Sequence, residues 1–257
     1  VIILPEILKT DWTNLATKYA NSITLGSGQF CTNPGIIIGI KSAYFTDFEN
    51  SLAEKILDIA PSCMLHPNIL RNYNKNKQEI ISDKKVNVVA NFDEDVDINY
   101  SKQTLAKVKG SDFIINNDLQ EEIFGPFSLL VECDNMSQLK SVVNKINGQL
   151  TGTIIASDNE ISSNKDLIDI LKERVGRIIL NGVPTGVEVN ASMLHGGPYP
   201  ASTDSRFTAV GVKSIDRWVR PLSYQDFPNK LLPDSLQDNN PKNILRLVNG
   251  IYTKNKI

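Results

Sequence analysis

The sequence predicts an α/β fold in which helices flank a largely parallel β-sheet. Three observations support this expectation. Short apolar runs rich in β-branched residues alternate with longer stretches whose apolar residues recur every three or four positions. The chain has 257 residues, of which 41% are hydrophobic, so it can bury a substantial core. Residues 182–208 are rich in Gly, Pro, Ser and Thr, which predicts a loop-rich carboxyl-terminal region.

The first half of the chain should alternate between strands and helices. A strand over 1–4 is stopped by Pro5. Apolar residues at helical spacing predict amphipathic helices over 8–23, 45–59 and 68–81. The continuous apolar run at 36–40 predicts a buried strand, and a further strand is expected over 86–90. Residues 105–115 should also be extended.

The second half should continue the alternation. Strands are expected over 127–132, 151–156 and 177–181. Helices are expected over 136–146 and 167–175, the second with Ser163 or Asn164 as its N-cap and Gly176 just past its end. A short helix over 212–219 and a polar tail complete the chain.

Composition excludes several classes of function. The net charge is -2 and there is no basic stripe, so nucleic acid is not expected as a partner. No apolar run has the length of a membrane span. Three widely spaced cysteines and two histidines predict neither a disulfide framework nor a zinc site, and favour a reduced, cytoplasmic location. The acidic run 93–97 lacks the spacing of a calcium loop, so no metal site is expected.

Cys31 lies in a connection between a predicted helix and a predicted strand. Gly26 and Gly28 precede it, and Pro34 and Gly35 follow it. Glycine permits unusual dihedrals and close approach, while proline fixes φ, so the cysteine is expected on a compact and conformationally specified loop. Such a loop suits a nucleophile. The alternative is that Cys31 is a small buried hydrophobic residue, as most free cysteines are.

A second stretch, Glu122-Ile-Phe-Gly-Pro126, forms a predicted turn into a strand. Gly125 allows a tight turn and Pro126 cannot continue a helix, so Glu122 and Phe124 are presented from the turn. A carboxylate can accept hydrogen bonds from sugar hydroxyls, and an aromatic ring can pack against a heterocycle. The alternative is a capped turn with Phe124 in the core.

The two stretches occur in this order about ninety residues apart, and together they resemble the aldehyde dehydrogenase superfamily. The resemblance runs over nearly the whole chain and includes the segments 148–154, 176–181 and 182–189. Residues 29–35 and 195–203 are most similar to one branch, the 2,5-dioxovalerate (α-ketoglutaric semialdehyde) dehydrogenases and the related NADP-dependent fatty aldehyde dehydrogenases.

The resemblance implies a role for each candidate residue. Cys31 would be the nucleophile that forms a thiohemiacetal and then a thioester with an aldehyde. Glu122 would bind the nicotinamide ribose and Phe124 would pack near the nicotinamide ring of NADP or NAD, with NADP favoured by the branch. Phe30 flanks the nucleophile and would contact substrate, although a core role is equally open. The loop 182–199 would line the path to the substrate.

Three further residues have open roles. His195, which Gly196 and Gly197 follow, is expected to fix a loop by hydrogen bonding. Arg177 and Arg206 are candidates for binding a substrate carboxylate.

The resemblance also predicts the domain organisation. Residues 1–205 would form the catalytic domain and 206–257 a carboxyl-terminal tail, with the nucleotide-binding domain absent from this chain. The family's base glutamate, oxyanion asparagine and glycine-rich nucleotide segment would precede Val1, so we expect a fragment that is inactive alone. The full-length protein is expected to be a homodimer or homotetramer.

The expected activity is NAD(P)-dependent oxidation of an aldehyde to a carboxylate, with 2,5-dioxovalerate as the substrate. A medium- or long-chain fatty aldehyde is the alternative substrate. Two other classes remain open: a catalytically silent homologue, and a cofactor-free cysteine hydrolase that would need a Cys–His pair.

Overall fold

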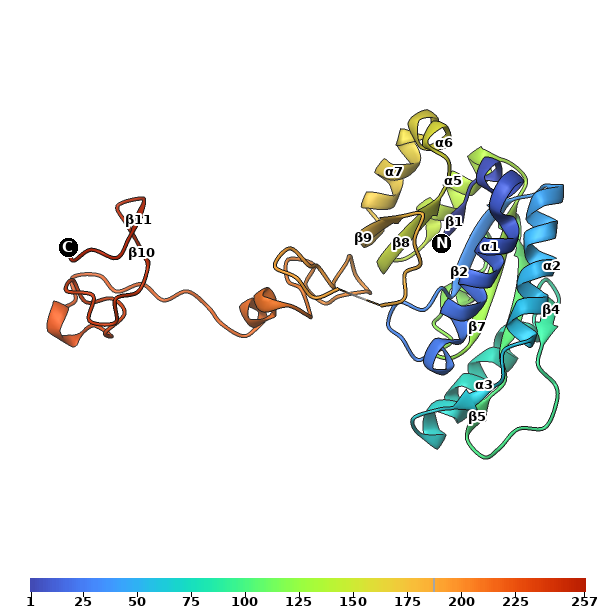
Figure 1. The fold of residues 1–257 in the computed structure, drawn as a ribbon, viewed down its shortest axis with the longest axis horizontal. Coiled ribbons are helices and arrows are strands. Elements are labelled where there is room, and N and C mark those ends of the chain that lie inside the picture. Colours follow the sequence, from blue (N-terminus) through green and yellow to red (C-terminus); the bar gives the residue numbers. More distant parts are fainter. Residues whose placement is uncertain (187) are drawn as a thin grey trace. The chain divides into compact units, whose positions relative to one another are not determined.

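The computed structural model describes residues 1–186 and 188–257 (Figure 1). The chain divides into two compact units, Val1–Arg217 and Trp218–Ile257. In the first unit, seven strands form one sheet in the order β4-β6-β7-β2-β1-β8-β9. All neighbouring strands are parallel except β4 and β6, which are antiparallel. The predicted α/β fold with a largely parallel sheet is therefore confirmed.

The elements of the first unit alternate along the chain. The strands of the large sheet are β1 (Ile2–Ile3), β2 (Ile36–Ile40), β4 (Asn87–Asn91), β6 (Thr104–Lys109), β7 (Phe127–Cys133), β8 (Gln149–Ile155) and β9 (Val175–Leu180). The α-helices are α1 (Pro5–Thr24), α2 (Ala43–Leu57), α3 (Pro67–Ile81), α4 (Gly110–Ile115), α5 (Met136–Lys145), α6 (Asp158–Ser163) and α7 (Lys165–Lys172). The shorter elements are the 3₁₀ turns η1 (Leu25–Gly28), η2 (Asn117–Gln120) and η3 (Val212–Arg217), and the antiparallel pair β3 (Ser62–Cys63) and β5 (Tyr100–Ser101).

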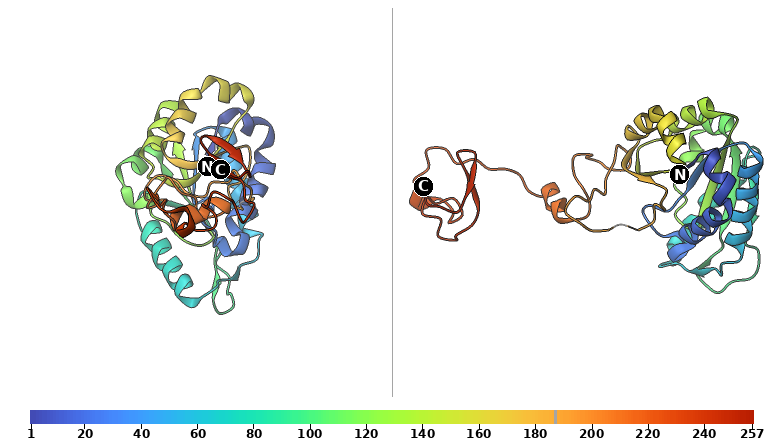
Figure 2. Two further views of the ribbon diagram at one scale, coloured as in Figure 1. Left: turned by 90° about the vertical axis from the view of Figure 1, so that its left-hand side faces the viewer. Right: turned by 45° about the horizontal axis from the view of Figure 1, so that its top comes forward.

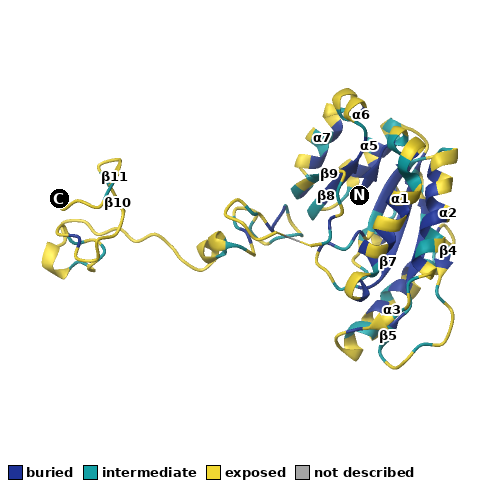
Figure 3. Cartoon of the chain, in the orientation of Figure 1, coloured by how far each residue is buried: buried dark blue, intermediate teal, exposed yellow. Residues whose placement is uncertain are grey.

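The sheet buries both of its faces, as alternate side chains of the central strands show. Ile37 and Leu130 belong to the cluster that α1 and α2 cover, whereas Ile38 and Leu129 belong to the cluster that α3, α4, α5 and α7 cover. Figures 1 and 2 show the helices on the two sides of the sheet. The buried positions concentrate on the strands and on the inward sides of the helices (Figure 3).

Residues 110–115 form the helix α4, so the expectation of an extended segment over 105–115 is wrong in its second half. Six residues are too few to show helical periodicity in the sequence. Asp112 lies in the first turn of α4, where a negative charge is favourable, and Phe113 is fully buried. The strand β6 ends at Lys109, and α4 begins at the next residue.

The segment around α6 and α7 also differs from expectation. The helix α6 was not expected from the sequence, although Ser157 and Glu160 form a capping box at its start. The helix α7 ends at Lys172, and Gly176 lies within β9 and not at a helix end. A Cβ on Gly176 would lie 1.9 Å from the carbonyl oxygen of Gly196. Close approach of another loop therefore explains this glycine.

The second unit is small and contains a short 3₁₀ turn and a hairpin. These elements are η4 (Asn229–Leu231), β10 (Arg246–Val248) and β11 (Ile251–Thr253). Asn249 and Gly250 have φ of 48° and 82°, as expected for an Asn-Gly hairpin turn. The buried Asn240 side chain bonds the backbone of Ile244 and Lys254. Among residues 1–186 and 188–257, no helix combines the length and apolar character needed to cross a membrane.

Candidate active site

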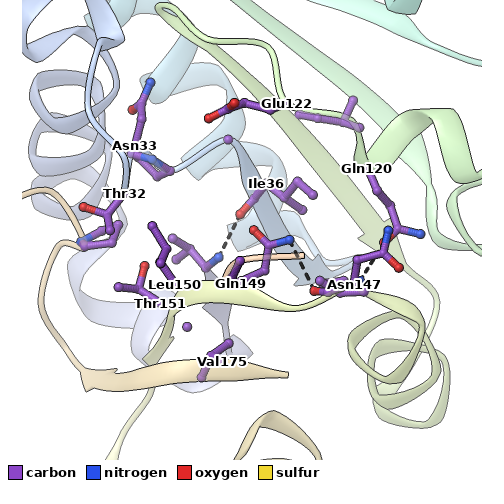
Figure 4. Close-up of a pocket in the computed structure, with 18 of the residues that line it drawn as sticks. Thr32, Asn33, Ile36, Gln120, Glu122, Asn147, Gln149, Leu150, Thr151 and Val175 are labelled. Atoms are coloured by element: carbon purple, nitrogen blue, oxygen red, sulfur yellow. Dashed lines mark hydrogen bonds between the residues drawn. The ribbon is translucent and has the colours of Figure 1, made fainter. Parts of the chain in front are cut away.

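A cavity of about 490 Å³ lies at the amino ends of adjacent parallel strands. Its lining comes from segments that lead directly into those strands: 28–36 into β2, 119–124 toward β7, 146–149 into β8, and Arg174 into β9. Because the strands are parallel, their amino ends meet at one edge of the sheet. Figure 4 shows that side chains distant in sequence, such as Thr32, Glu122 and Thr151, surround the same space.

A left-handed turn precedes Cys31 and sets the path of its loop. Gly26, Ser27 and Gly28 have φ of 56°, 58° and 66°. Ser27 is not a glycine, so its left-handed conformation is strained and needs support from its surroundings. Its buried hydroxyl lies 2.6 Å from the Ser62 hydroxyl and 2.9 Å from the Ser62 carbonyl oxygen. The pair β3–β5 therefore holds the turn that leads to the cysteine.

Cys31 is exposed and lines the cavity, and so does the neighbouring Phe30. The alternative of a small buried hydrophobic residue does not describe Cys31. In the described part of the chain, the backbone N–H of Cys31 meets no hydrogen-bond acceptor. An open N–H beside an exposed thiol can donate to an oxygen that becomes negatively charged on attack by sulfur.

The other two cysteines differ from Cys31. Cys63 is exposed but lies outside the described lining of the cavity. Cys133 is fully buried, and burial, with a smaller effect of the Asp134 and Glu132 carboxylates, raises the pKa of its thiol to about 12. Of the described cysteines, only Cys31 combines exposure with a place in the cavity.

Glu122 and Phe124 line the same cavity as Cys31. Glu122 is exposed and Phe124 is half-buried, so the alternative of a core Phe124 does not hold. The turn that carries them rests on Tyr73, because a Cβ on Gly125 would lie 2.3 Å from that ring. The Tyr73 hydroxyl donates to the carbonyl oxygens of Lys102 at 2.7 Å and Pro126 at 3.3 Å. In Figure 4 the Glu122 carboxylate points toward the side where Thr32 and Asn33 lie.

The structure places the remaining candidates outside the described lining of the cavity. His195 is buried, and its backbone fixes the loop: its N–H donates to the Thr208 hydroxyl at 2.8 Å, and its carbonyl accepts from Ala209 at 2.8 Å. Burial, followed by the charge of Arg177, lowers the pKa of the His195 ring. The predicted role as a loop-fixing residue is therefore carried by the main chain.

Neither arginine proposed to bind a carboxylate lines the cavity. The Arg206 guanidinium donates two hydrogen bonds to the Asp204 carboxylate, at 2.9 and 2.6 Å, and Arg177 donates to the Pro184 carbonyl oxygen at 3.4 Å. Of the expected lining segment 182–199, Pro184 faces the cavity, and Val187 lies outside the described residues.

Two residues that line the cavity were not expected from the sequence. Arg174 lines the cavity and donates to Asn144 at 2.8 Å, but nothing in its sequence context distinguished it. Asn33 also lines the cavity. Its position two residues after Cys31, between a thiol and a proline, was the available signal.

Solved structures share this fold. Delta-pyrroline-5-carboxylate dehydrogenase from Mycobacterium tuberculosis aligns with a TM-score of 0.69 and 15% identity, over 90% of this chain and 44% of that one. Betaine aldehyde dehydrogenase from Staphylococcus aureus aligns with a TM-score of 0.68 and 14% identity, over 84% of this chain and 43% of that one. None of the known family models matches the sequence.

The chain belongs to the aldehyde dehydrogenase superfamily, as the resemblance predicted. It is 39% identical over 256 residues to an alpha-ketoglutaric semialdehyde dehydrogenase of Acinetobacter baylyi, covering 99% of this chain and 49% of the relative. It is 34% identical over 250 residues to alpha-ketoglutaric semialdehyde dehydrogenase 2 of Azospirillum brasilense, covering 97% of this chain and 48% of the relative. The chain thus spans about half the length of these curated relatives.

Proposed function

We propose that this chain is the catalytic half of an NAD(P)-dependent aldehyde dehydrogenase that oxidises α-ketoglutaric semialdehyde (2,5-dioxovalerate). One observation carries the proposal: Cys31, Glu122 and Phe124, which come from two loops far apart in sequence, line one cavity. The 39% identity to an enzyme named for this substrate supports the choice of aldehyde.

Cys31 supplies the nucleophile. Its thiolate attacks the aldehyde carbon and forms a thiohemiacetal, and the negative charge on the former carbonyl oxygen receives a hydrogen bond from the Cys31 backbone N–H. Removal of hydride from that carbon leaves a thioester on Cys31. Water then adds to the thioester carbon, the carboxylic acid leaves, and the thiolate is restored.

We infer that the cavity takes up the nicotinamide end of a dinucleotide. Glu122 and Phe124 both line the cavity; the exposed Glu122 carboxylate would accept hydrogen bonds from ribose hydroxyls, and the half-buried Phe124 ring would pack against a planar ring. Bound NAD or NADP would supply the oxidising step by taking up the hydride. We favour NADP because of the branch that the sequence resembles. Gly26, Ser27 and Gly28 support the Cys31 loop, and we assign them no part in binding phosphate.

Thioester hydrolysis needs a general base, and the carboxylates in the described lining are those of Glu121 and Glu122. Glu122 already has a role with ribose. Because the superfamily that the chain resembles carries these parts ahead of its cysteine, we propose that the base, the nucleotide-binding domain and a second oxyanion donor lie outside these 257 residues. General base catalysis is worth about 10²–10⁴-fold, so its loss would leave the chain alone with little turnover.

Residues 1–205 would form the catalytic domain and 206–257 its tail, and the complete enzyme would be a cytoplasmic homodimer or homotetramer. A cofactor-free cysteine hydrolase is not favoured, because neither His66 nor His195 lies in the described lining with Cys31.

The test joins this chain to a nucleotide-binding half, either one encoded in its own gene or the matching half of the Acinetobacter baylyi relative. NAD(P)H formation is then measured with α-ketoglutaric semialdehyde and with decanal. Preference for the semialdehyde supports the proposal, and preference for decanal would establish the fatty aldehyde alternative. Absence of turnover, together with failure of iodoacetamide to alkylate Cys31 at neutral pH, would favour a catalytically silent homologue.

A further inference from the structure

Asn33 connects the two loops that carry the candidate catalytic and cofactor-binding residues. Its side-chain Nδ2 donates to the carbonyl oxygen of Gly28 at 3.2 Å and to that of Gly125 at 2.9 Å. Gly28 belongs to the turn before Cys31, and Gly125 belongs to the turn after Phe124. One amide group thus ties the loop of the nucleophile to the turn that presents Glu122 and Phe124.

The chemistry of the two partners fixes the orientation of this amide. Carbonyl oxygens can only accept hydrogen bonds, so the NH₂ end of Asn33 must face both of them. An aspartate of the same shape would present an acceptor to two acceptors. A serine could donate only one hydrogen bond, and a leucine none.

The connection is built on close packing of the two backbones. A Cβ on Gly28 would lie 2.2 Å from the carbonyl carbon of Gly125, so the two backbone segments are in contact where Asn33 bridges them. The loop of Asn33 is itself held by its own backbone, since its N–H donates to the Phe30 carbonyl at 3.1 Å and its carbonyl accepts from Gly35 at 2.8 Å. Cys31 lies within the turn that these bonds define.

The other end of the Asn33 side chain argues against a general role in stability. Its Oδ1 is buried and has no partner among the described residues. A buried unpaired acceptor is unfavourable, so an apolar side chain would serve better if filling space were the purpose. The two hydrogen bonds donated by the NH₂ group therefore explain why an asparagine occupies this position.

We propose that Asn33 is a positioning residue that sets the distance between the Cys31 sulfur and the groups on the Glu122–Phe124 turn. This inference rests on the proposed function, in which sulfur, substrate carbon and nicotinamide ring must align. An error of about 1 Å in such an alignment can cost about 10²-fold in rate. Asn33 acts through the two loops and not by contact with the reacting atoms.

The first test needs no activity and uses the 257-residue chain. Hydrogen–deuterium exchange is followed in peptides covering 26–35 and 121–127 for Asn33→Leu, Asn33→Asp and Asn33→Ser. In the Leu and Asp variants, the backbone amides of both segments should exchange about tenfold faster than in the wild-type chain. This factor is typical of losing one or two hydrogen bonds. The Ser variant should show a smaller change, and peptides from α5 and α7 should not change.

Asn76→Leu is the matched control. Asn76 also donates to the turn, at 3.4 Å to the Glu122 carbonyl oxygen, but it is half-buried on α3 and its side chain does not connect the two loops. We expect no coupled change in this variant. Faster exchange in only one of the two segments, or in neither, would overturn the proposal. Faster exchange throughout the chain in all three Asn33 variants, with lower unfolding temperatures, would show a general stabilising role and overturn it as well.

The second test uses the chain joined to its nucleotide-binding half. Asn33→Leu should lower kcat by about 10²-fold while the KM for NAD(P) changes much less, because the nucleotide-binding half of the joined enzyme would hold most of the dinucleotide. An unchanged kcat would overturn the positioning role. If the wild-type enzyme shows no turnover, the proposed function fails, and the exchange result still decides whether Asn33 couples the two loops.

Discussion

Gly28 packs directly against the backbone of Gly125, so closely that a Cβ on Gly28 would lie 2.2 Å from the carbonyl carbon of Gly125. This contact joins the loop of Cys31 to the turn of Glu122 and Phe124. The site therefore depends on a place where two main chains meet without side chains between them. Its tolerance to substitution should be low at this point and high only a few residues away.

Gly28→Ala should be strongly destabilising. The added Cβ would collide with backbone that has little freedom to move, and the residue has φ of 66°. Overpacking costs about 1–3 kcal/mol, and the left-handed conformation adds about 1–2 kcal/mol. Chemical denaturation measures the free energy of unfolding. Gly35→Ala is the matched control, because a Cβ there meets nothing within 4 Å, and equal effects of the two variants would contradict the close contact.

The three thiols should react in an order set by exposure. We expect iodoacetamide at neutral pH to alkylate Cys31 and Cys63 in the folded chain, and Cys133 only after unfolding. Peptide mass spectrometry at several reaction times gives the three rates. Early modification of Cys133 would show that its part of the core opens readily.

The buried Cys133 should make the folded chain less stable in alkali. Its pKa is raised from 9.0 to about 12, so between these values the unfolded chain releases a proton that the folded chain keeps. The contribution of the Cys133 thiol to the free energy of unfolding is at its full value below about pH 9 and falls as the pH rises toward 12. Cys133→Ala should therefore lose stability less steeply than wild type over this range. If the free energy of unfolding fell equally steeply with pH in the two proteins, the raised pKa of Cys133 would be contradicted.

Arg206 should be dispensable for binding the substrate carboxylate. It is exposed and paired with Asp204, and it lies outside the described lining of the cavity. Arg206→Gln in the joined enzyme should leave the KM for the semialdehyde within about twofold, and an exposed ion pair contributes only about 0–1 kcal/mol to stability. A large rise in the KM for the semialdehyde, with an unchanged KM for decanal, would indicate that Arg206 binds the substrate carboxylate.

Much of this architecture could be predicted from the sequence, because long apolar periodicities dominate it. The run 36–40 and the helices over 45–59 and 68–81 correspond to β2, α2 and α3 with shifts of a few residues at their ends. The short helices could not be predicted equally well. The helix α4 has only six residues, which are too few to show a periodic apolar pattern. Its features are the buried Phe113 and the negative charge of Asp112 in its first turn.

The candidate site was partly predictable for a different reason. Cys31, Glu122 and Phe124 stand in distinctive local sequences, so their chemistry could be inferred before the structure placed them together. Contacts between distant segments had no such signal. The use of Gly176 for the approach of Gly196, the packing of Gly28 on Gly125 and the double hydrogen bond of Asn33 all depend on tertiary structure.

The most direct test of the central claim is a rapid-quench experiment with the joined enzyme, α-ketoglutaric semialdehyde and NAD(P). Peptide mass spectrometry then identifies the residue that carries the acyl group. We predict a thioester on Cys31, absent in Cys31→Ser and unaffected in Cys63→Ser. Turnover without an adduct on Cys31, or an acyl group on another residue, would contradict the assignment of Cys31 as the nucleophile.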